Sequence, residues 1–118
     1  MSNGVPVDVP VAPAAPVVVH TLPADSTSGL AFLDVVSLSL QNTDTVNDAV
    51  LNVIFTPVSG PVITQKYAVP SMEAAKVLDE AALGGPLSGL GGATISLQLE
   101  AQGSTAARGW GWFVRTRG

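Results

Sequence analysis

Strict alternation of apolar and polar residues between Ala93 and Ala101 restricts the fold of this chain more than any other feature of its sequence. One side of an extended strand would carry the apolar residues and the other side the polar ones: Ala93, Ile95, Leu97, Leu99 and Ala101 against Thr94, Ser96, Gln98 and Glu100. This two-residue period predicts a β-strand with one face in a hydrophobic core and the other in water.

A second extended run, from Gly109 to Val114, follows the connection Gln-Gly-Ser-Thr-Ala-Ala at residues 102–107. Because this connection is polar and contains glycine, it suits the turn between two neighbouring antiparallel strands. We therefore predict that residues 93–101 and 109–114 pair with each other as a hairpin.

Trp110 and Trp112 share one face of the second run. In a hairpin opposite Leu97 and Leu99, we expect the two indoles to pack in the core or at an interface between subunits. The alternative is an exposed platform on which sugar rings stack. Exposure distinguishes the two interpretations, since a pair of exposed indoles favours sugar binding and a buried pair favours a scaffold.

Turn-forming residues divide much of the remaining chain into further predicted strands, at residues 17–22, 30–41, 50–56 and 62–69. Short strands at this spacing predict a mainly β chain folded as an antiparallel β-sandwich or jelly roll. Between residues 71 and 83, strong helix formers favour one short helix with Ser71 as its N-cap. A short strand over Lys76–Asp79 is the alternative for this segment.

Residues 1–16 differ in composition, because prolines are interleaved with valines (Pro6, Pro10, Pro13 and Pro16 with Val5, Val7, Val9 and Val11). Proline lacks a backbone donor and fixes φ, so this segment predicts an extended arm rather than a helix or a central strand. We therefore divide the chain into an arm, residues 1–16, and a β-sandwich domain, residues 17–118. Because the arm is apolar and cannot pair with itself, we expect its four valines to dock on another subunit; an idle tail is the alternative.

The composition excludes several classes of function. The chain of 118 residues has no cysteine, so it has neither disulfides nor a thiol nucleophile. Charged residues make up only 12 % of it and the net charge is -4, which argues against a nucleic-acid-binding surface. No apolar run approaches the roughly 20 residues that cross a bilayer. So few charges are typical of a protein that is packed against partners.

Catalytic and metal-binding patterns are weak. His20 is the sole histidine and lies in an apolar predicted strand, so we interpret it as structural. Asn42, Asp44, Asn47 and Asp48 offer oxygen ligands, but without an EF-hand pattern they favour a tight turn over a calcium site. We therefore predict no catalytic residue, no cofactor and no metal, and hence that the chain is not an enzyme.

From about Val35 to Thr116 the sequence resembles the small β-sandwich accessory proteins, of the decoration or cement kind, that belong to the virions of tailed bacteriophages. Six segments carry the resemblance: Val36–Thr43, Ala49–Phe55, Val69–Pro70, Val77–Asp79, Gly91–Ile95 and Trp110–Val114. The resemblance implies a virion component with an arm that reaches across subunits, and it transfers no site residue, because such proteins act through surfaces.

We therefore expect a non-enzymatic viral structural protein, a capsid decoration or cement subunit that stabilises contacts between coat subunits. Its expected partners are the major capsid protein or other virion subunits and further copies of itself, with neither nucleic acid nor membrane. Its expected place is the capsid surface, after assembly in the host cytoplasm. The alternatives are a carbohydrate- or receptor-binding β-sandwich module and a head–tail or tail accessory subunit.

Overall fold

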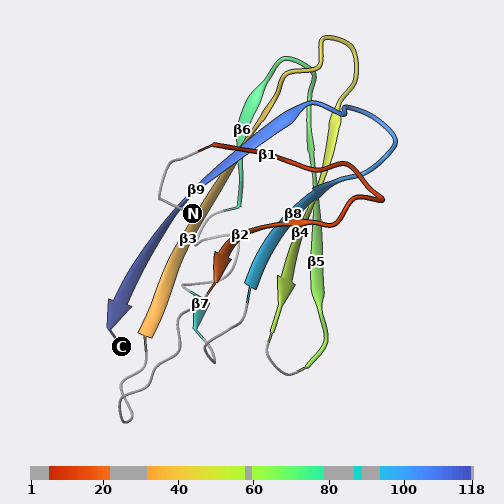
Figure 1. Ribbon diagram of the computed structural model, residues 1–118. Coiled ribbons are helices and arrows are strands. Elements are labelled where there is room, and N and C mark those ends of the chain that lie inside the picture. The colour runs from red at the N-terminus through yellow and green to blue at the C-terminus, as the bar shows by residue number, and fades with distance from the viewer. Residues whose placement is uncertain (1–5, 22–31, 58–59, 79–86, 89–93, 118) are drawn as a thin grey trace.

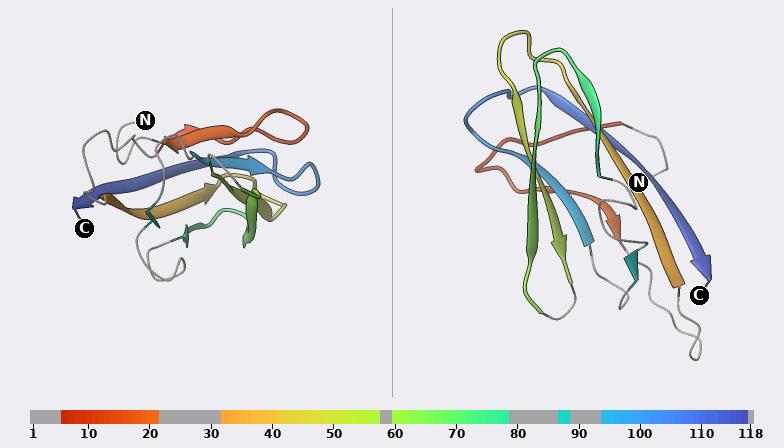
Figure 2. Two further views of the ribbon diagram at one scale, coloured as in Figure 1. Left: turned by 90° about the horizontal axis from the view of Figure 1, so that it is seen from below. Right: turned by 180° about the vertical axis from the view of Figure 1, so that it is seen from behind.

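The computed structural model describes residues 6–21, 32–57, 60–78, 87–88 and 94–117, and in these residues the chain is built from strands without a helix. Two antiparallel sheets face each other, which confirms the predicted β-sandwich (Figures 1 and 2). The strands are β1 (Val7–Asp8), β2 (Val17–Thr21), β3 (Phe32–Asn42), β4 (Ala49–Thr56), β5 (Ile63–Val69), β6 (Ala74–Leu78), β7 (Leu87–Ser88), β8 (Thr94–Leu99) and β9 (Ala107–Arg117).

The strand order is that of a jelly roll. One sheet has the order β1-β9-β3-β6, with the two-residue β7 attached to β3, and the other has the order β2-β8-β4-β5. Apart from β7, the pairs β4–β5, β3–β6, β2–β8 and β1–β9 form one long antiparallel hairpin. This hairpin is rolled up so that β9 also pairs with β3 and β8 with β4. Such a double-sheet roll of eight strands is the jelly-roll architecture.

Alternating residues of the central strands form the core between the sheets. Leu97 and Leu99 of β8 are at most 1 % exposed, so the predicted inward face of this strand is confirmed, and Leu38 and Leu40 of β3 are fully buried opposite them. Ser96, expected to face water, is only 7 % exposed. Its short side chain lies on an interior strand, where larger residues of β2 and β4 stand at the paired positions on both sides.

The predicted hairpin of β8 and β9 is wrong, because the two strands belong to different sheets. Their connection crosses between the sheets at Gly103, whose φ of +109° is a conformation that glycine adopts readily and other residues rarely do. The next residue, Ser104, is fully buried, and its N–H donates to the carbonyl of Asp48 at 2.9 Å. The bend is therefore fixed by a contact with the distant β3–β4 connection, which a local sequence pattern does not contain.

The faces of β9 are also opposite to the expected ones, since its glycines point inward. A Cβ on Gly109 would lie 2.8 Å from Leu97 Cδ1, and one on Gly111 would lie 2.8 Å from Leu38 Cδ2. The core therefore fills the space beside both glycines, and the alternate positions, with Trp110 and Trp112, face outward. We expected both indoles to pack in the core or at an interface between subunits; the core alternative is wrong for Trp112, which is 56 % exposed, and the interface alternative stays a prediction.

The segment 7–12 is part of the sandwich, so the expectation that its valines find no partner within their own chain is wrong. Val9 is 5 % exposed in the core, with Val7 and Val11 packed against the same cluster; Val5 lies outside the described residues. Backbone hydrogen bonds join Val9 to β9 in one sheet and residues 10 and 12 to β8 in the other. Figure 1 shows this segment, in red, crossing from β1 to the second sheet before it turns back into β2. Residues 7–12 thus connect the two sheets along one side of the sandwich.

The helix favoured for residues 71–83 is also wrong as far as the structure describes them, since residues 74–78 form β6; residues 79–83 lie outside the described part. A turn precedes the strand, with the Glu73 N–H donating to the Pro70 carbonyl at 3.2 Å. β6 then pairs with β3, and Val77 is buried in the core. Sheet pairing and burial override the helix propensity of Ala, Glu and Lys, which amounts to only tenths of a kcal/mol per residue, at most about 0.7.

Candidate functional site

His20, the sole histidine, is packed against another ring. Its imidazole stacks on Phe113 of β9 with ring centroids 4.3 Å apart and ring planes within 3° of parallel. This contact lies between the two sheets, because β2 and β9 belong to opposite layers. The position of His20 therefore has a packing explanation.

The polar residues after β3 build a rigid turn. Asn42 is 1 % exposed, and its Nδ2 donates to the carbonyls of Asn47 at 2.9 Å and Val69 at 3.1 Å. Asp44 Oδ1 accepts the N–H groups of Val46 at 2.8 Å and Asn47 at 2.9 Å. These two hydrogen bonds, led by that from Asn47, lower the pKa of Asp44 below its ordinary value. The predicted turn is confirmed, and Asn42 Oδ1 and Asp44 Oδ1 accept hydrogen bonds from backbone N–H groups within it.

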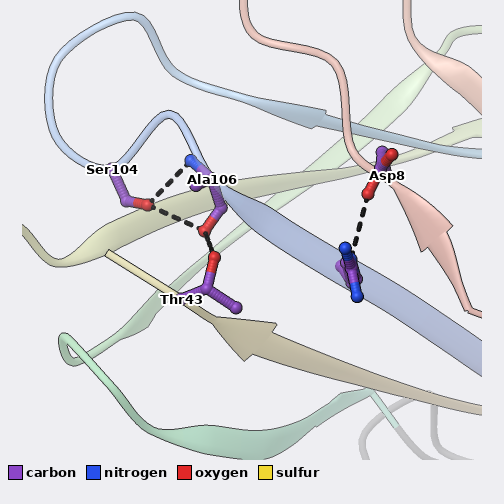
Figure 3. A network of polar contacts seen from close by, with 5 residues as sticks. Asp8, Thr43, Ser104 and Ala106 are labelled. Atoms are coloured by element: carbon purple, nitrogen blue, oxygen red, sulfur yellow. Dashed lines mark hydrogen bonds and ion pairs between the residues drawn. The ribbon is translucent and has the colours of Figure 1, made fainter. Parts of the chain in front are cut away.

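Hydrogen bonds also join this turn to the two other connections at the same end of the sandwich. Met72 N–H donates to the Asp44 carbonyl at 3.0 Å, and Thr43 donates to the Ala106 carbonyl from both its N–H (3.0 Å) and its Oγ1 (2.9 Å). Figure 3 shows Ser104 Oγ converging on the same residue, where it accepts from the Ala106 N–H at 3.2 Å. We call residues 43–48, 70–73 and 100–106 the loop end.

Two apolar side chains project from the loop end into solvent. Val46 is 78 % exposed and Met72 is 66 % exposed, the two largest exposures among the large apolar residues of the described chain. Met72 also has φ +62°, a left-handed conformation that is uncommon for a residue other than glycine, asparagine or aspartate. Sequence reasoning missed both residues, although a lone valine inside a polar turn is a visible signal.

The same three segments contain several carboxylates. The loop end contains Asp44, Asp48, Glu73 and Glu100 and neither lysine nor arginine. Glu100 forms an ion pair with Lys66 of β5. The loop end therefore combines two exposed apolar side chains with an excess of carboxylates.

A second candidate surface is the outer face of the β1-β9-β3-β6 sheet. It carries Trp110 and Trp112, which lie two positions apart on β9. On the neighbouring strand β3, Ser39 stands opposite Trp110 and Ser37 opposite Trp112. Trp112 is 56 % exposed and Trp110 is half-buried. At the end of this face nearest β1, Arg108 Nε and Asp8 Oδ1 form an exposed ion pair at 3.2 Å, drawn in Figure 3.

In the described part of the chain, no three histidine, cysteine, aspartate or glutamate side chains lie close enough together to hold a metal ion. The same residues include no helix with the length and hydropathy needed to cross a membrane. No family model, curated protein or solved structure matches the chain.

Proposed function

We propose that this protein is a non-enzymatic virion subunit that decorates an assembled capsid and docks on it through the loop end. The observation that carries the proposal is the exposure of Val46 and Met72 on a framework fixed by hydrogen bonds. Apolar side chains held in solvent by a hydrogen-bonded support suit a protein-binding surface, because little conformational entropy is lost when a partner buries them.

The backbone at Met72 supports the same interpretation. A left-handed φ at a residue with a side chain costs on the order of 1–3 kcal/mol and is found most often where function requires it. The turn here holds a long, adaptable apolar side chain away from the core, and methionine fits irregular partner surfaces well. The loop end therefore offers two anchors of the kind that a partner pocket accepts.

The carboxylates of the loop end define the partner surface further. Because Glu100 is already paired with Lys66, three carboxylates of the loop end remain for a partner. A surface that accepts Val46 and Met72 beside these carboxylates should be an apolar depression edged by lysine or arginine. A coat subunit has to present this surface in its assembled form. Binding only to the assembled shell then stabilises it by mass action, by about 2.7 kcal/mol per site at a free concentration 100 times the Kd.

Fold and sequence are compatible with this role. Jelly rolls occur in viral capsid proteins, and also in lectins and cupins, so the architecture supports the proposal only by analogy. The resemblance to phage decoration proteins points in the same direction. Residues 7–12, once expected to reach another subunit, close the chain's own roll, so the proposed contact depends on the loop end.

Cosedimentation with particles that lack the protein tests the proposal. The double variant Val46→Ser/Met72→Asn removes both apolar anchors, and asparagine tolerates the left-handed φ at position 72. Val62→Ser/Ile63→Asn is the matched control, because it makes the same kind of change at residues 55 % and 54 % exposed beside the β4–β5 connection. We expect the loop-end variant to lose occupancy and the control to keep it.

Two outcomes would overturn this proposal. Equal occupancy of both variants would show that the loop end is not the docking surface. Equal binding of the wild-type protein to unassembled coat subunits and to particles would remove the mechanism of stabilisation, which requires preference for the assembled state.

A further inference from the structure

The outer face of the β1-β9-β3-β6 sheet carries a compact row of side chains that the loop end does not use. Trp112 and Trp110 of β9 stand opposite Ser37 and Ser39 of β3, and Ser39 in turn stands opposite Lys76 of β6. We call these five residues the tryptophan strip. Successive outward residues on a strand are about 6.6 Å apart, so the two indoles are direct neighbours.

The strip is exposed because of how the core is filled. Gly109 and Gly111 place no side chain at two neighbouring positions of the inner face of β9, where Leu97 and Leu38 occupy the space. Large residues at the alternate positions must therefore point away from the core. Small serines on the adjacent strand leave the indole of Trp112 uncovered, with 56 % of its surface in solvent.

We propose that the tryptophan strip binds an oligosaccharide, with one sugar ring stacked on the Trp112 indole and the next reaching Trp110. The apolar C–H face of a pyranose matches the flat, electron-rich face of an indole. The serine hydroxyls both donate and accept hydrogen bonds, and the Lys76 ammonium donates them, which suits the hydroxyl groups at the ring edge. The row contains no carboxylate, so a neutral or acidic glycan can approach it.

A protein partner fits the strip less well. A tryptophan buries at most about 250 Å² on complete burial, and both indoles are already partly covered. Together they offer far less than the roughly 800 Å² per partner that a stable protein interface needs. The flanking residues are polar, so the apolar area does not extend beyond the two rings.

Single-stranded nucleic acid also stacks on aromatic rings, but it requires cations along its backbone. Lys76 is the one cation of the strip, and the nearby Arg108 is paired with Asp8. With a net charge of -4 on the whole chain, the balance favours an uncharged or weakly charged ligand.

Tryptophan fluorescence tests the proposal directly, because Trp110 and Trp112 are the chain's two tryptophans. The full chain is titrated with a panel of soluble probes: cellohexaose, chitohexaose, xylohexaose, mannohexaose and a bacterial O-antigen polysaccharide. We expect a saturable change in emission with at least one of these. Trp112→Ala should weaken that binding at least about tenfold, as measured by calorimetry, and Trp112→Phe should retain part of it.

Two matched variants keep the test specific. Ser37→Ala should weaken binding without altering the indoles, whereas Gln98→Ala, on the opposite sheet, should leave binding unchanged. Trp112→Ala should stay folded, with a melting temperature somewhat below that of the wild type because part of the side chain is covered, so its loss of binding is measured on folded protein. No response to any glycan, an unchanged affinity in Trp112→Ala, or saturation by oligothymidylate in place of a sugar would overturn the proposal.

This inference is independent of the capsid proposal. The Val46→Ser/Met72→Asn variant changes the loop end alone and should bind the same glycan with unchanged affinity. If both proposals hold, a subunit docked through its loop end would present the tryptophan strip to glycans at the particle surface.

Discussion

Replacing Val9 with alanine should destabilise the isolated protein substantially, because the segment that was expected to be a free arm is part of the core. The Val9 side chain is 5 % exposed, and its Cγ2 lies 3.5 Å from the position of a Cβ built on Gly109. Removing two buried methyl groups forfeits about 1.6 kcal/mol of apolar burial, and the cavity that remains raises the loss to about 2–3 kcal/mol. At roughly 4 °C per kcal/mol for a domain of this size, the melting temperature should fall by about 8–12 °C.

Val46→Ala is the matched control, since it makes the same chemical change at a side chain that is 78 % exposed. It should alter stability by no more than about 0.5 kcal/mol. Urea and thermal unfolding followed by circular dichroism measure both variants, and an unchanged m-value would confirm that the same surface is exposed on unfolding. Equal midpoints for the two variants would refute the placement of residues 7–12 in the sandwich.

Three further stability measurements test the crossover and the loop end. Gly103→Ala should cost several kcal/mol of stability, because its Cβ would lie 2.6 Å from the Asp48 carbonyl oxygen. Gly60 has a similar φ (+113°) but open space around it, so Gly60→Ala should cost only about 1–3 kcal/mol of backbone strain, and equal costs would contradict the steric argument. Because the pKa of Asp44 is lower in the folded protein than its ordinary value of 3.8, the carboxylate stabilises the fold at any pH above 3.8, and this contribution is lost as the pH falls through the folded pKa. Melting temperatures between pH 5 and 2 should therefore fall less steeply in Asp44→Asn than in the wild type, and parallel curves would exclude a contribution from this carboxylate. Asn42→Ala should cost about 3 kcal/mol in urea unfolding, since it leaves the buried Val69 carbonyl and the part-buried Asn47 carbonyl without their donor. A loss below about 1 kcal/mol would show that water replaces the amide.

The strands themselves were predictable because their signals are local. Alternation fixes which side of a strand is buried, and at Leu97 and Leu99 this followed from neighbouring residues alone. The turn after β3 was predictable for the same reason, since Asp44 makes its hydrogen bonds to residues two and three positions away. Fold class depends on the number and spacing of such elements, and it could therefore be predicted from the sequence.

Pairing and the sites were not predictable, because they depend on contacts between distant segments. The strand β8 pairs with β2 and β4, both distant in the sequence, and not with the neighbouring β9. The connection between β8 and β9 is itself held by a hydrogen bond from Ser104 to Asp48, 56 positions away. The inward face of β9 follows from how Leu97 and Leu38 fill the space beside two glycines. Val9 looked unpartnered because the prolines near it argue against a central strand. A segment at the edge of a sheet needs only a few backbone hydrogen bonds, so the same prolines are tolerated there.

The location of the protein on native particles tests the central claim most directly. Immunogold labelling followed by electron microscopy, or averaging of the capsid shell in cryo-electron micrographs, would provide it. We predict label at regular positions over the outer surface of the head, with density for the jelly roll contacting coat subunits through residues 43–48 and 70–73. Label confined to the tail, or purified particles that carry none of the protein, would contradict the account.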